Sequence, residues 1–196
     1  YETSLNIMND LSNDSDTVVI ATGANFADAL SISPYSYASA SPIILCDPTS
    51  GLSNEALEAI SNGGYSKAVI VGGVNAVPEA ILPKLEECGI TNITRLSGET
   101  RYETSQKIAE FELSQALGFG VDGIALATGA NFPDALAAGP VAGRRLSPLL
   151  LVDQGAVSAS QWLSSRSDSI SGALIVGGEN AISDQDAQSL ASAMRI

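Results

Sequence analysis

Short apolar runs alternate with segments of helical spacing along this chain. Three continuous runs, Val18–Ala21, Pro42–Cys46 and Ala68–Val71, are each followed within two residues by Gly or Asp, as is typical of strands buried on both faces. Helical spacing marks residues 26–38, 54–61 and 79–88. This β-α-β-α-β order with short connections predicts a small parallel sheet flanked by helices on both faces.

The same pattern returns in the second half of the chain, with apolar runs at residues 124–127, 149–152 and 173–176. Ala21–Leu30 recurs 106 residues later as Ala127–Leu136 with one substitution. Similarity over about 100 residues is too long for a solenoid unit and suits a small domain duplicated head to tail. We therefore predict an α/β protein of two tandem units, residues 1–97 and 98–196. Residues 93–96 are expected to form an extra strand that joins the copies.

Further landmarks support the duplication and show an asymmetry. Val71–Val77 matches Val176–Ile182, and Tyr1–Ser4 matches Tyr102–Ser105, which in the second copy follows the leader Arg95–Arg101. The first copy lacks this leader, so we expect the chain to be a piece of a longer protein with the missing residues upstream.

Capping chemistry agrees with the predicted helices. Asn25 with Asp28, and likewise Asn131 with Asp134, place an N-cap side chain and an acidic partner at a helix start, and residues 100–103 form a capping box. Pro34 and Pro140 lie well inside the helix that follows, where proline must kink or end it. The carbonyls freed at Leu30 and Leu136 are candidate ligand contacts, and a bent helix wrapped around the sheet is the alternative.

The charge of the chain limits its partners. The net charge is −13 and only nine residues are Lys or Arg, whereas nucleic-acid binding depends on clustered basic residues. The absence of any apolar run of about 18 residues also argues against a membrane span. We therefore expect neither nucleic acid nor membrane as a partner.

The absence of histidine excludes Ser-His-Asp and Cys-His nucleophiles, an imidazole base and His-containing zinc sites. Cys46 and Cys88 correspond to apolar residues in the other copy, so we expect two free, buried thiols. Without an identifiable catalytic base or metal-ligand spacing, the sequence predicts no enzyme, no cofactor and no metal site.

Three groups of residues carry a binding interpretation beside a structural one. The Gly-Gly turns at residues 72–73 and 177–178 fit either a tight strand-to-helix turn or an anion site. Four aspartates end strands or begin helices, and because both copies keep them, a structural role is favoured: Asp28, Asp47, Asp134 and Asp153. Arg144 and Arg145 are adjacent cations, either a solvated pair or an anion contact.

Several motifs in order resemble the cell wall binding repeat type 2 family of Gram-positive bacteria. They are the segment Arg95–Ser105, the Gly-x-Asn-Phe-Ala/Pro-Asp-Ala-Leu stretch in both copies, the Pro-Ile/Leu-Ile/Leu-Leu runs and the Val-Gly-Gly-x-Asn-Ala turns. The resemblance spans nearly the whole chain. It implies Rossmann-like or Toprim-like units, usually three in tandem as a pseudo-threefold triangle, in an extracellular, non-enzymatic module that anchors a surface protein to the wall.

The resemblance also implies a partner and a set of binding residues. The partner would be an anionic cell-wall polysaccharide or teichoic-acid-like polymer, with a third repeat or another copy of the chain as a packing partner. Family motifs implicated in binding fall on Arg95, Arg101, Pro42, Ile43, Ile44, Leu45, Pro148, Leu149, Leu150 and Leu151. From the residues we add Arg144 and Arg145 as anion contacts, and Thr22, Asn25, Thr128 and Asn131 as contacts to sugar hydroxyls in loops at the carboxyl ends of the strands. A self-assembly or adhesion module and, less strongly, an enzyme acting on wall glycans remain alternatives.

Overall fold

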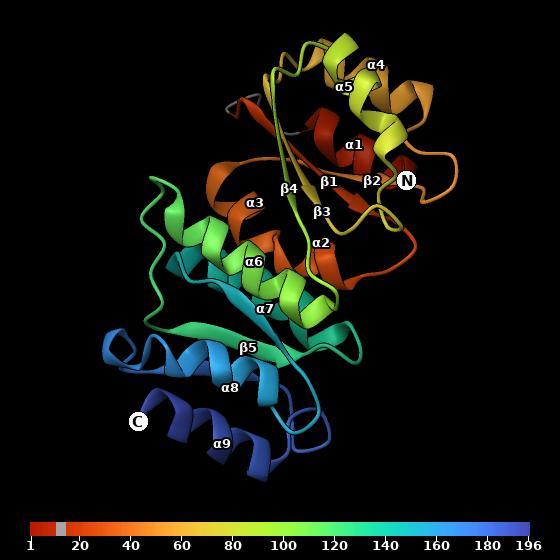
Figure 1. The fold of residues 1–196 in the computed structure, drawn as a ribbon. Helices are drawn as coiled ribbons and strands as arrows, with labels where there is room; N and C mark the ends of the chain where they lie inside the picture. The colour runs from red at the N-terminus through yellow and green to blue at the C-terminus, as the bar shows by residue number, and fades with distance from the viewer. Residues whose placement is uncertain (11–14) are drawn as a thin grey trace.

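The fold is two α/β units in tandem, and the computed structural model describes residues 1–10 and 15–196 (Figure 1). The first unit contains α1 (Glu2–Asp10), β1 (Thr17–Thr22), α2 (Ala27–Ser31), α3 (Ser33–Ser39), β2 (Ile43–Cys46), α4 (Asn54–Asn62), β3 (Lys67–Val71), η1 (Glu79–Ile81), α5 (Leu82–Glu87) and β4 (Asn92–Leu96). The second contains α6 (Arg101–Ser114), β5 (Ile124–Thr128), α7 (Pro133–Arg145), β6 (Leu149–Val152), α8 (Val157–Ser164), η2 (Ser167–Ser169), β7 (Ala173–Val176) and α9 (Asp184–Met194). The predicted fold class is confirmed.

Both sheets are parallel, and their three equivalent strands follow the same order. The first runs β2-β1-β3-β4 and the second β6-β5-β7. The register is equivalent: Ile20 lies opposite Ile44 and Ile70, and Leu126 lies opposite Leu150 and Ile175. Every residue of β1 and β5 is buried, which explains why these strands read as continuous apolar runs.

The extra strand predicted at residues 93–96 is β4, and it belongs to the first sheet, where it pairs in parallel with β3. The predicted boundary after residue 97 falls between β4 and α6. β7 is the second unit's counterpart of β3. Among the described residues it pairs with β5 alone, and all four of its residues stay partly exposed.

The two units pack through helices on facing sides of their sheets. Figure 1 shows α2 and α3 of the first unit against α6 and α7 of the second. The contact of α3 with α7 depends on glycine: a Cβ at Gly143 would lie 2.8 Å from the carbonyl oxygen of Pro34 and 2.8 Å from Cβ of Tyr37. Small residues at this crossing let the helix backbones approach closely, so the units form one packed body.

The two prolines have different effects on their helices. Pro34 is the second residue of α3. The helix is interrupted at Ile32, which ends α2 and precedes α3. The Ser33 hydroxyl donates to the Leu30 carbonyl at 2.7 Å, so that carbonyl has a partner and is not a free ligand contact. In the second unit α7 continues through Pro140, which therefore does not end its helix.

The predicted caps are only partly correct. At α6, the Thr100 hydroxyl accepts from the Glu103 amide (3.2 Å) and the Glu103 carboxylate accepts from the Glu99 amide (2.9 Å). The Asn25 side chain accepts from the Ala27 amide (3.1 Å), but no side chain caps the helix at the assigned N-cap positions of α2 and α7. The prediction that Asp28 and Asp134 cap these helices is wrong.

A buried carboxyl group lies where the units meet. Glu112 of α6 is fully buried, and its Oε1 accepts from the Tyr35 amide at the start of α3 (3.1 Å). Its Oε2 is buried and has no hydrogen-bond partner among the described residues. Burial raises the pKa of Glu112 well above its usual range, and the Tyr35 hydrogen bond offsets this only partly.

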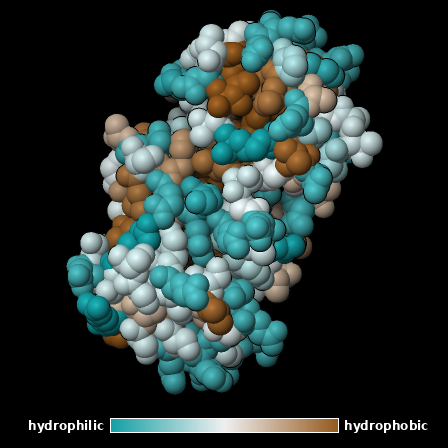
Figure 2. Space-filling view, viewed as in Figure 1, coloured by the Kyte–Doolittle hydropathy of each residue, from teal (hydrophilic) through white to brown (hydrophobic). Residues whose placement is uncertain are grey.

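Hydrophilic and intermediate residues, teal to white, cover most of the face seen in Figure 2, and hydrophobic patches interrupt them near the top and at the left. None of the helices in the described part of the chain is long and apolar enough to cross a membrane.

Candidate ligand-binding grooves

The turn that follows the first strand is built in the same way in both units. Thr22 ends β1 and Thr128 ends β5, and their hydroxyls accept from the amides of Ala24 and Ala130, each at 3.2 Å. In each sheet the first strand lies between the second and the third. Crossovers that leave on opposite faces open a crevice beyond the carboxyl ends of such strands.

A tyrosine at the start of each unit covers this turn: Tyr1 immediately precedes α1, and Tyr102 lies in the first turn of α6. A Cβ at Gly23 would lie 2.4 Å from Tyr1 Cε1, and a Cβ at Gly129 would lie 2.5 Å from Tyr102 Cε1. The glycine of the Thr-Gly-Ala-Asn motif is therefore needed for close approach of an aromatic ring. One wall of each crevice is thus aromatic.

In the second unit the crevice is a groove of about 600 Å³, which we call the carboxyl-edge groove. It is lined from the loops after β5, β6 and β7 and from α6 by Tyr102, Thr128, Ala130, Asn131, Val152, Asp153, Gln154, Gly155, Glu179, Asn180, Ala181, Ser183, Gln185 and Asp186. The lining includes three carboxylates and no Lys or Arg. Its charge disfavours a phosphate inside the groove, whereas its amide side chains suit hydroxyl groups.

The aspartates that end the second strands are structural, as predicted. Asp47 Oδ1 accepts from the amides of Thr49 (2.9 Å) and Ser50 (2.8 Å), and these bonds lower its pKa. Asp153 accepts from the Ser158 amide in the first turn of α8 (3.2 Å). Across the described residues, no group of three His, Cys, Asp or Glu side chains could hold a metal ion.

Asp28 and Asp134 face the Gly-Gly turns. A Cβ at Gly72 would lie 2.6 Å from Asp28 Oδ2, and one at Gly177 would lie 2.8 Å from Asp134 Oδ2. Both glycines also have positive φ, +102° and +128°. These positions therefore require glycine for two reasons, the positive φ and the lack of space for a Cβ atom. Burial raises the pKa of Asp28, against the opposing charge of Arg101.

Two of the four predicted arginine contacts are used inside the protein. Arg95 Nη1 donates to the carbonyls of Gly72 (2.9 Å) and Val77 (3.0 Å), so this guanidinium holds the Gly-Gly turn and is not free for a polymer. Arg101 Nη1 donates to the Gly129 carbonyl (2.6 Å), and its guanidinium lies 5.3 Å from the centroid of the Phe26 ring. Arg101 therefore links the two units.

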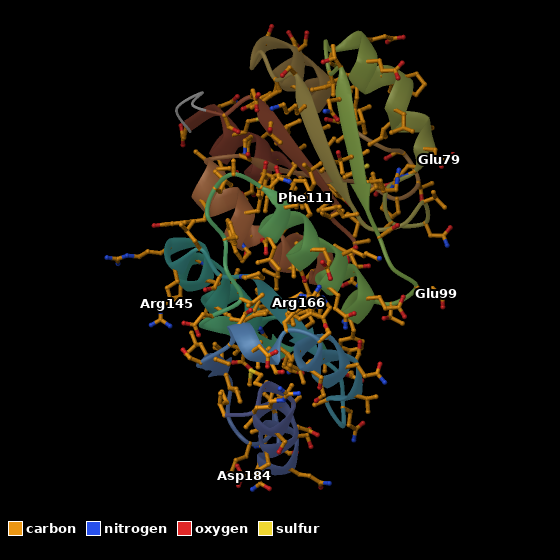
Figure 3. All side chains as sticks on the ribbon, turned by 60° about the vertical axis from the view of Figure 1, so that its left-hand side comes forward. Glu79, Glu99, Phe111, Arg145, Arg166 and Asp184 are labelled. Carbon is orange, nitrogen blue, oxygen red and sulfur yellow. The ribbon has the colours of Figure 1, made fainter. Side chains whose placement is uncertain are left out.

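Arg144 and Arg145 are exposed in the last turn of α7, where cations interact favourably with the helix dipole. Figure 3 shows Arg145 projecting away from the body of the protein. The loop containing Thr128 and Asn131 lies at the opposite end of this helix. A helix of 13 residues separates the two by about 20 Å at 1.5 Å per residue, so the predicted arginines and loop contacts do not form one site.

The apolar segments implicated by the family motif are core strands. Leu149, Leu150 and Leu151 are at most 2% exposed, and Ile44 is fully buried. Pro42 and Pro148 are buried as well, whereas Ile43 and Leu45 are partly exposed. The buried side chains have no surface with which to touch a polymer, so the expectation of direct contact by Pro148–Leu151 is wrong for this geometry.

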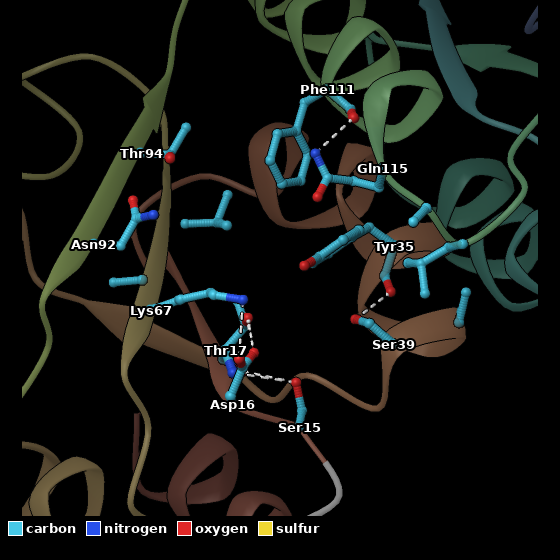
Figure 4. A pocket seen from close by; sticks show the side chains of 15 residues that line it. Ser15, Asp16, Thr17, Tyr35, Ser39, Lys67, Asn92, Thr94, Phe111 and Gln115 are labelled. Atoms are coloured by element: carbon cyan, nitrogen blue, oxygen red, sulfur yellow. Dashed lines mark hydrogen bonds and ion pairs between the residues drawn. The ribbon is translucent and has the colours of Figure 1, made fainter.

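A larger groove, which the sequence did not reveal, lies between the units. It has a volume of about 860 Å³ and combines the starts of β1, β3 and β4 with α3 and the end of α6. Figure 4 shows Asn92, Thr94 and Lys67 on one side, and Tyr35, Phe111 and Gln115 on the other. We call it the inter-repeat groove. Predicting it requires the packing of the units, which no local pattern encodes.

Duplicated parallel units with the same turn after the first strand define this chain as a tandem α/β binding module. It matches the family described as Cell wall binding domain 2 (CWB2) over residues 1–82 and 95–186, and it belongs to that family. It is a cell-wall-binding module, and its place is outside the cell, at the cell wall of Gram-positive bacteria.

Curated relatives contain the module as part of larger proteins. The chain is 28% identical over 196 residues to the N-acetylmuramoyl-L-alanine amidase LytC of Bacillus subtilis (strain 168), covering 100% of this chain and 38% of that protein. It is 28% identical over 154 residues to the Amidase enhancer of the same organism, covering 79% of this chain and 21% of that protein. The chain thus spans less than two fifths of either relative.

Two solved structures share the fold. Cwp6 from Clostridium difficile superposes with a TM-score of 0.86 at 24% identity, covering 98% of this chain and 30% of that one. Cwp8 from the same organism gives a TM-score of 0.79 at 22% identity, covering 98% of this chain and 32% of that one.

Proposed function

We propose that this module binds an anionic cell-wall glycopolymer noncovalently and without catalysis, through surfaces repeated in its two units. The observation that carries the proposal is the turn after the first strand, built twice with the same Thr hydroxyl to Ala amide bond at 3.2 Å and the same tyrosine cover. A polymer repeats its chemical groups along its length, so duplicated surfaces suit it better than they suit one small substrate.

The distribution of charge on the module suggests two kinds of contact with the polymer, one to its sugar hydroxyls and one to its anionic groups. The carboxyl-edge groove, with its carboxylates and amides, would receive sugar hydroxyls through Asn131, Gln154 and their neighbours. Phosphate or carboxylate groups of the polymer would meet Arg144 and Arg145, which are exposed at the far end of α7. The Debye length is about 8 Å at 0.15 M salt, so the remaining acidic surface is largely screened from this pair.

Sedimentation with purified Gram-positive cell walls tests the proposal. The double variant Arg144→Ala and Arg145→Ala is expected to lose at least tenfold in wall affinity, and the salt dependence of binding is expected to become shallower. The control Lys107→Ala with Arg195→Ala removes two exposed positive charges elsewhere and is expected to bind as the parent does. Equal binding by all three proteins refutes the arginine contact.

A second variant tests the groove. Asn131→Ala with Gln154→Ala removes two exposed side chains of the carboxyl-edge groove. Each hydrogen bond to the polymer is worth about 1 kcal/mol, which corresponds to a loss of about fivefold in affinity for each side chain. Undiminished wall binding would remove this groove from the binding surface.

A specific observation also favours self-association. Phe132, which precedes α7, and Leu136 and Val141 of that helix are 52%, 56% and 41% exposed. The counterparts of the first two in the first unit, Phe26 and Leu30, pack against the second unit. The exposed side of α7 around Leu136 would therefore take a further repeat or another copy of the chain. Light scattering of the isolated chain tests this: a monomer at high concentration refutes it, and Leu136→Gln is expected to reduce any association.

A further inference from the structure

We propose that the inter-repeat groove is a second binding site and that its ligand is an uncharged sugar unit of the wall. This deepens the proposed function and rests on it for the source of the ligand. The groove lies at the amino ends of the strands, because Thr17, Lys67 and Asn92 begin β1, β3 and β4. The carboxyl-edge groove lies at the carboxyl ends of the strands of the second unit and shares none of its lining residues.

The groove exists only because the two units pack together. Its wall on the second unit consists of Phe111, Gln115, Ala116 and Leu117, and every other lining residue comes from the first unit. Its volume of about 860 Å³ is in the range of small-ligand pockets, about 300–1,000 Å³. A disaccharide fits this space.

The charge of the groove is zero, which selects against a phosphate. The only ionisable lining groups that are charged at neutral pH are Lys67 and Asp16, and they pair at 2.9 Å. The hydrogen bond from Lys67 lowers the pKa of Asp16, and the same contact raises the pKa of Lys67. Both stay ionised at neutral pH, so the lining of the groove carries no net charge.

Hydrogen-bonding groups face the groove without partners. Within the described residues, the Tyr35 hydroxyl, the Asn92 amide and the Thr94 hydroxyl make no hydrogen bond, and in Figure 4 the Tyr35 hydroxyl points across the cavity toward Lys67. Hydroxyls and an amide can both donate and accept. Such groups match the hydroxyls and acetamido groups of a neutral sugar.

An aromatic surface completes the recognition. Tyr35 and Phe111 lie edge to face with ring centroids 5.1 Å apart, and Phe111 is partly exposed at the groove. Apolar and aromatic walls with a few placed polar groups are the usual composition of a ligand site. The C–H face of a sugar ring can pack against Phe111 while its hydroxyls reach β4.

The second unit does not repeat these residues. At the positions equivalent to Tyr35 and Lys67 it has Val141 and Gly172. The shared fold therefore needs neither the tyrosine nor the lysine. Their presence in the first unit alone separates this groove from the landmarks that shape both copies.

The test is a nuclear magnetic resonance titration of the whole chain with N,N′-diacetylchitobiose, an uncharged disaccharide of N-acetylglucosamine, and separately with a short poly(glycerol phosphate). The disaccharide is expected to shift backbone amides at Lys67, Asn92 and Thr94. The double variant Asn92→Ala with Thr94→Val is expected to lose at least tenfold in disaccharide affinity. The control is Gln161→Ala with Gln188→Ala, two exposed amide side chains that line neither groove, and it is expected to stay within twofold of the parent.

The proposal is overturned if the disaccharide leaves these amides unshifted at millimolar concentrations, if the β4 double variant binds it as the parent does, or if poly(glycerol phosphate) occupies the groove equally well. Wall sedimentation separates this result from the proposed function. Normal wall binding without disaccharide binding refutes the sugar site alone, whereas disaccharide binding without wall binding refutes the wall-anchoring proposal alone.

Discussion

The buried carboxyl of Glu112 makes the stability of this protein depend on pH in a defined direction. Its pKa is raised by burial in the folded protein, while in the unfolded chain it takes the usual value of about 4.3 for glutamate. Between these two values the folded state holds the proton and the unfolded state has released it. The folded state therefore loses stability as pH rises through this window, and above the folded pKa the loss is complete.

The magnitude follows from the same linkage. Each pH unit of separation between the folded and unfolded pKa values costs about 1.4 kcal/mol of unfolding free energy at a pH above both. Glu112→Gln keeps an acceptor for the Tyr35 amide and carries no charge. It is expected to match the parent in stability near pH 4 and to exceed it by at least about 1 kcal/mol near pH 8.

Urea unfolding followed by circular dichroism at pH 4 and pH 8 measures the difference between variant and parent, so other titrating groups cancel. Glu86→Gln removes an exposed carboxylate and is expected to show no such difference. Glu112→Ala leaves the Tyr35 amide unpaired and is expected to cost about 1–3 kcal/mol at pH 4. At pH 8 its cost is expected to be smaller, because the variant also removes the buried carboxylate. If Glu112→Gln is no more stable than the parent at pH 8, the assignment of a buried, uncompensated carboxyl is wrong.

Other contacts give shorter predictions. Gly143→Ala is expected to destabilise the folded protein by about 1 kcal/mol, because crowding the Pro34 carbonyl costs about 1–3 kcal/mol and the better helix propensity of alanine returns about 1 kcal/mol. Thermal unfolding measures the change. The control is Gly178→Ala, whose Cβ would meet nothing within 4 Å. Arg95→Met removes two donors from the Gly-Gly turn and is expected to cost at least about 2 kcal/mol, with faster proteolysis of residues 72–77; unchanged cleavage would contradict the clamp. The Cys46 thiol, fully buried with its pKa raised by burial to about 11, is expected to resist iodoacetamide at pH 8 until the protein is unfolded, as mass spectrometry would detect.

The strands and the duplication could be read from the sequence because both are local properties. Buried parallel strands require continuous apolar runs, and β6 and β7 begin and end at the predicted residues. The β4 strand was also predicted, although Asn92–Leu96 is not a continuous apolar run and none of its residues is fully buried. The capping box at α6 was also predictable, since it needs only residues three positions apart.

The hydrogen-bond partners of Arg95 and Arg101 could not be predicted from the sequence. The family motif assigned Arg95 and Arg101 to polymer binding, yet each reaches a backbone carbonyl more than fifteen residues away in sequence. The same limit applies to Glu112, whose burial depends on how α6 meets α3. The aspartate Asp28 was assigned to a cap because its position along the chain fits one, but the side chain turns to Gly72 on a neighbouring loop.

The uncovered side of β7 makes the two units unequal in their local dynamics. In the first unit β4 protects the outer edge of β3 and the Arg95 guanidinium holds the turn beyond it. Within the described residues β7 has no strand on that edge, and no side chain hydrogen-bonds the carbonyls of Gly177 or Ile182. Local unfolding begins where few hydrogen bonds and contacts hold the backbone. Amide hydrogens of β7 are therefore expected to exchange with solvent before those of β3, and fluctuations that expose backbone begin at this end of the protein.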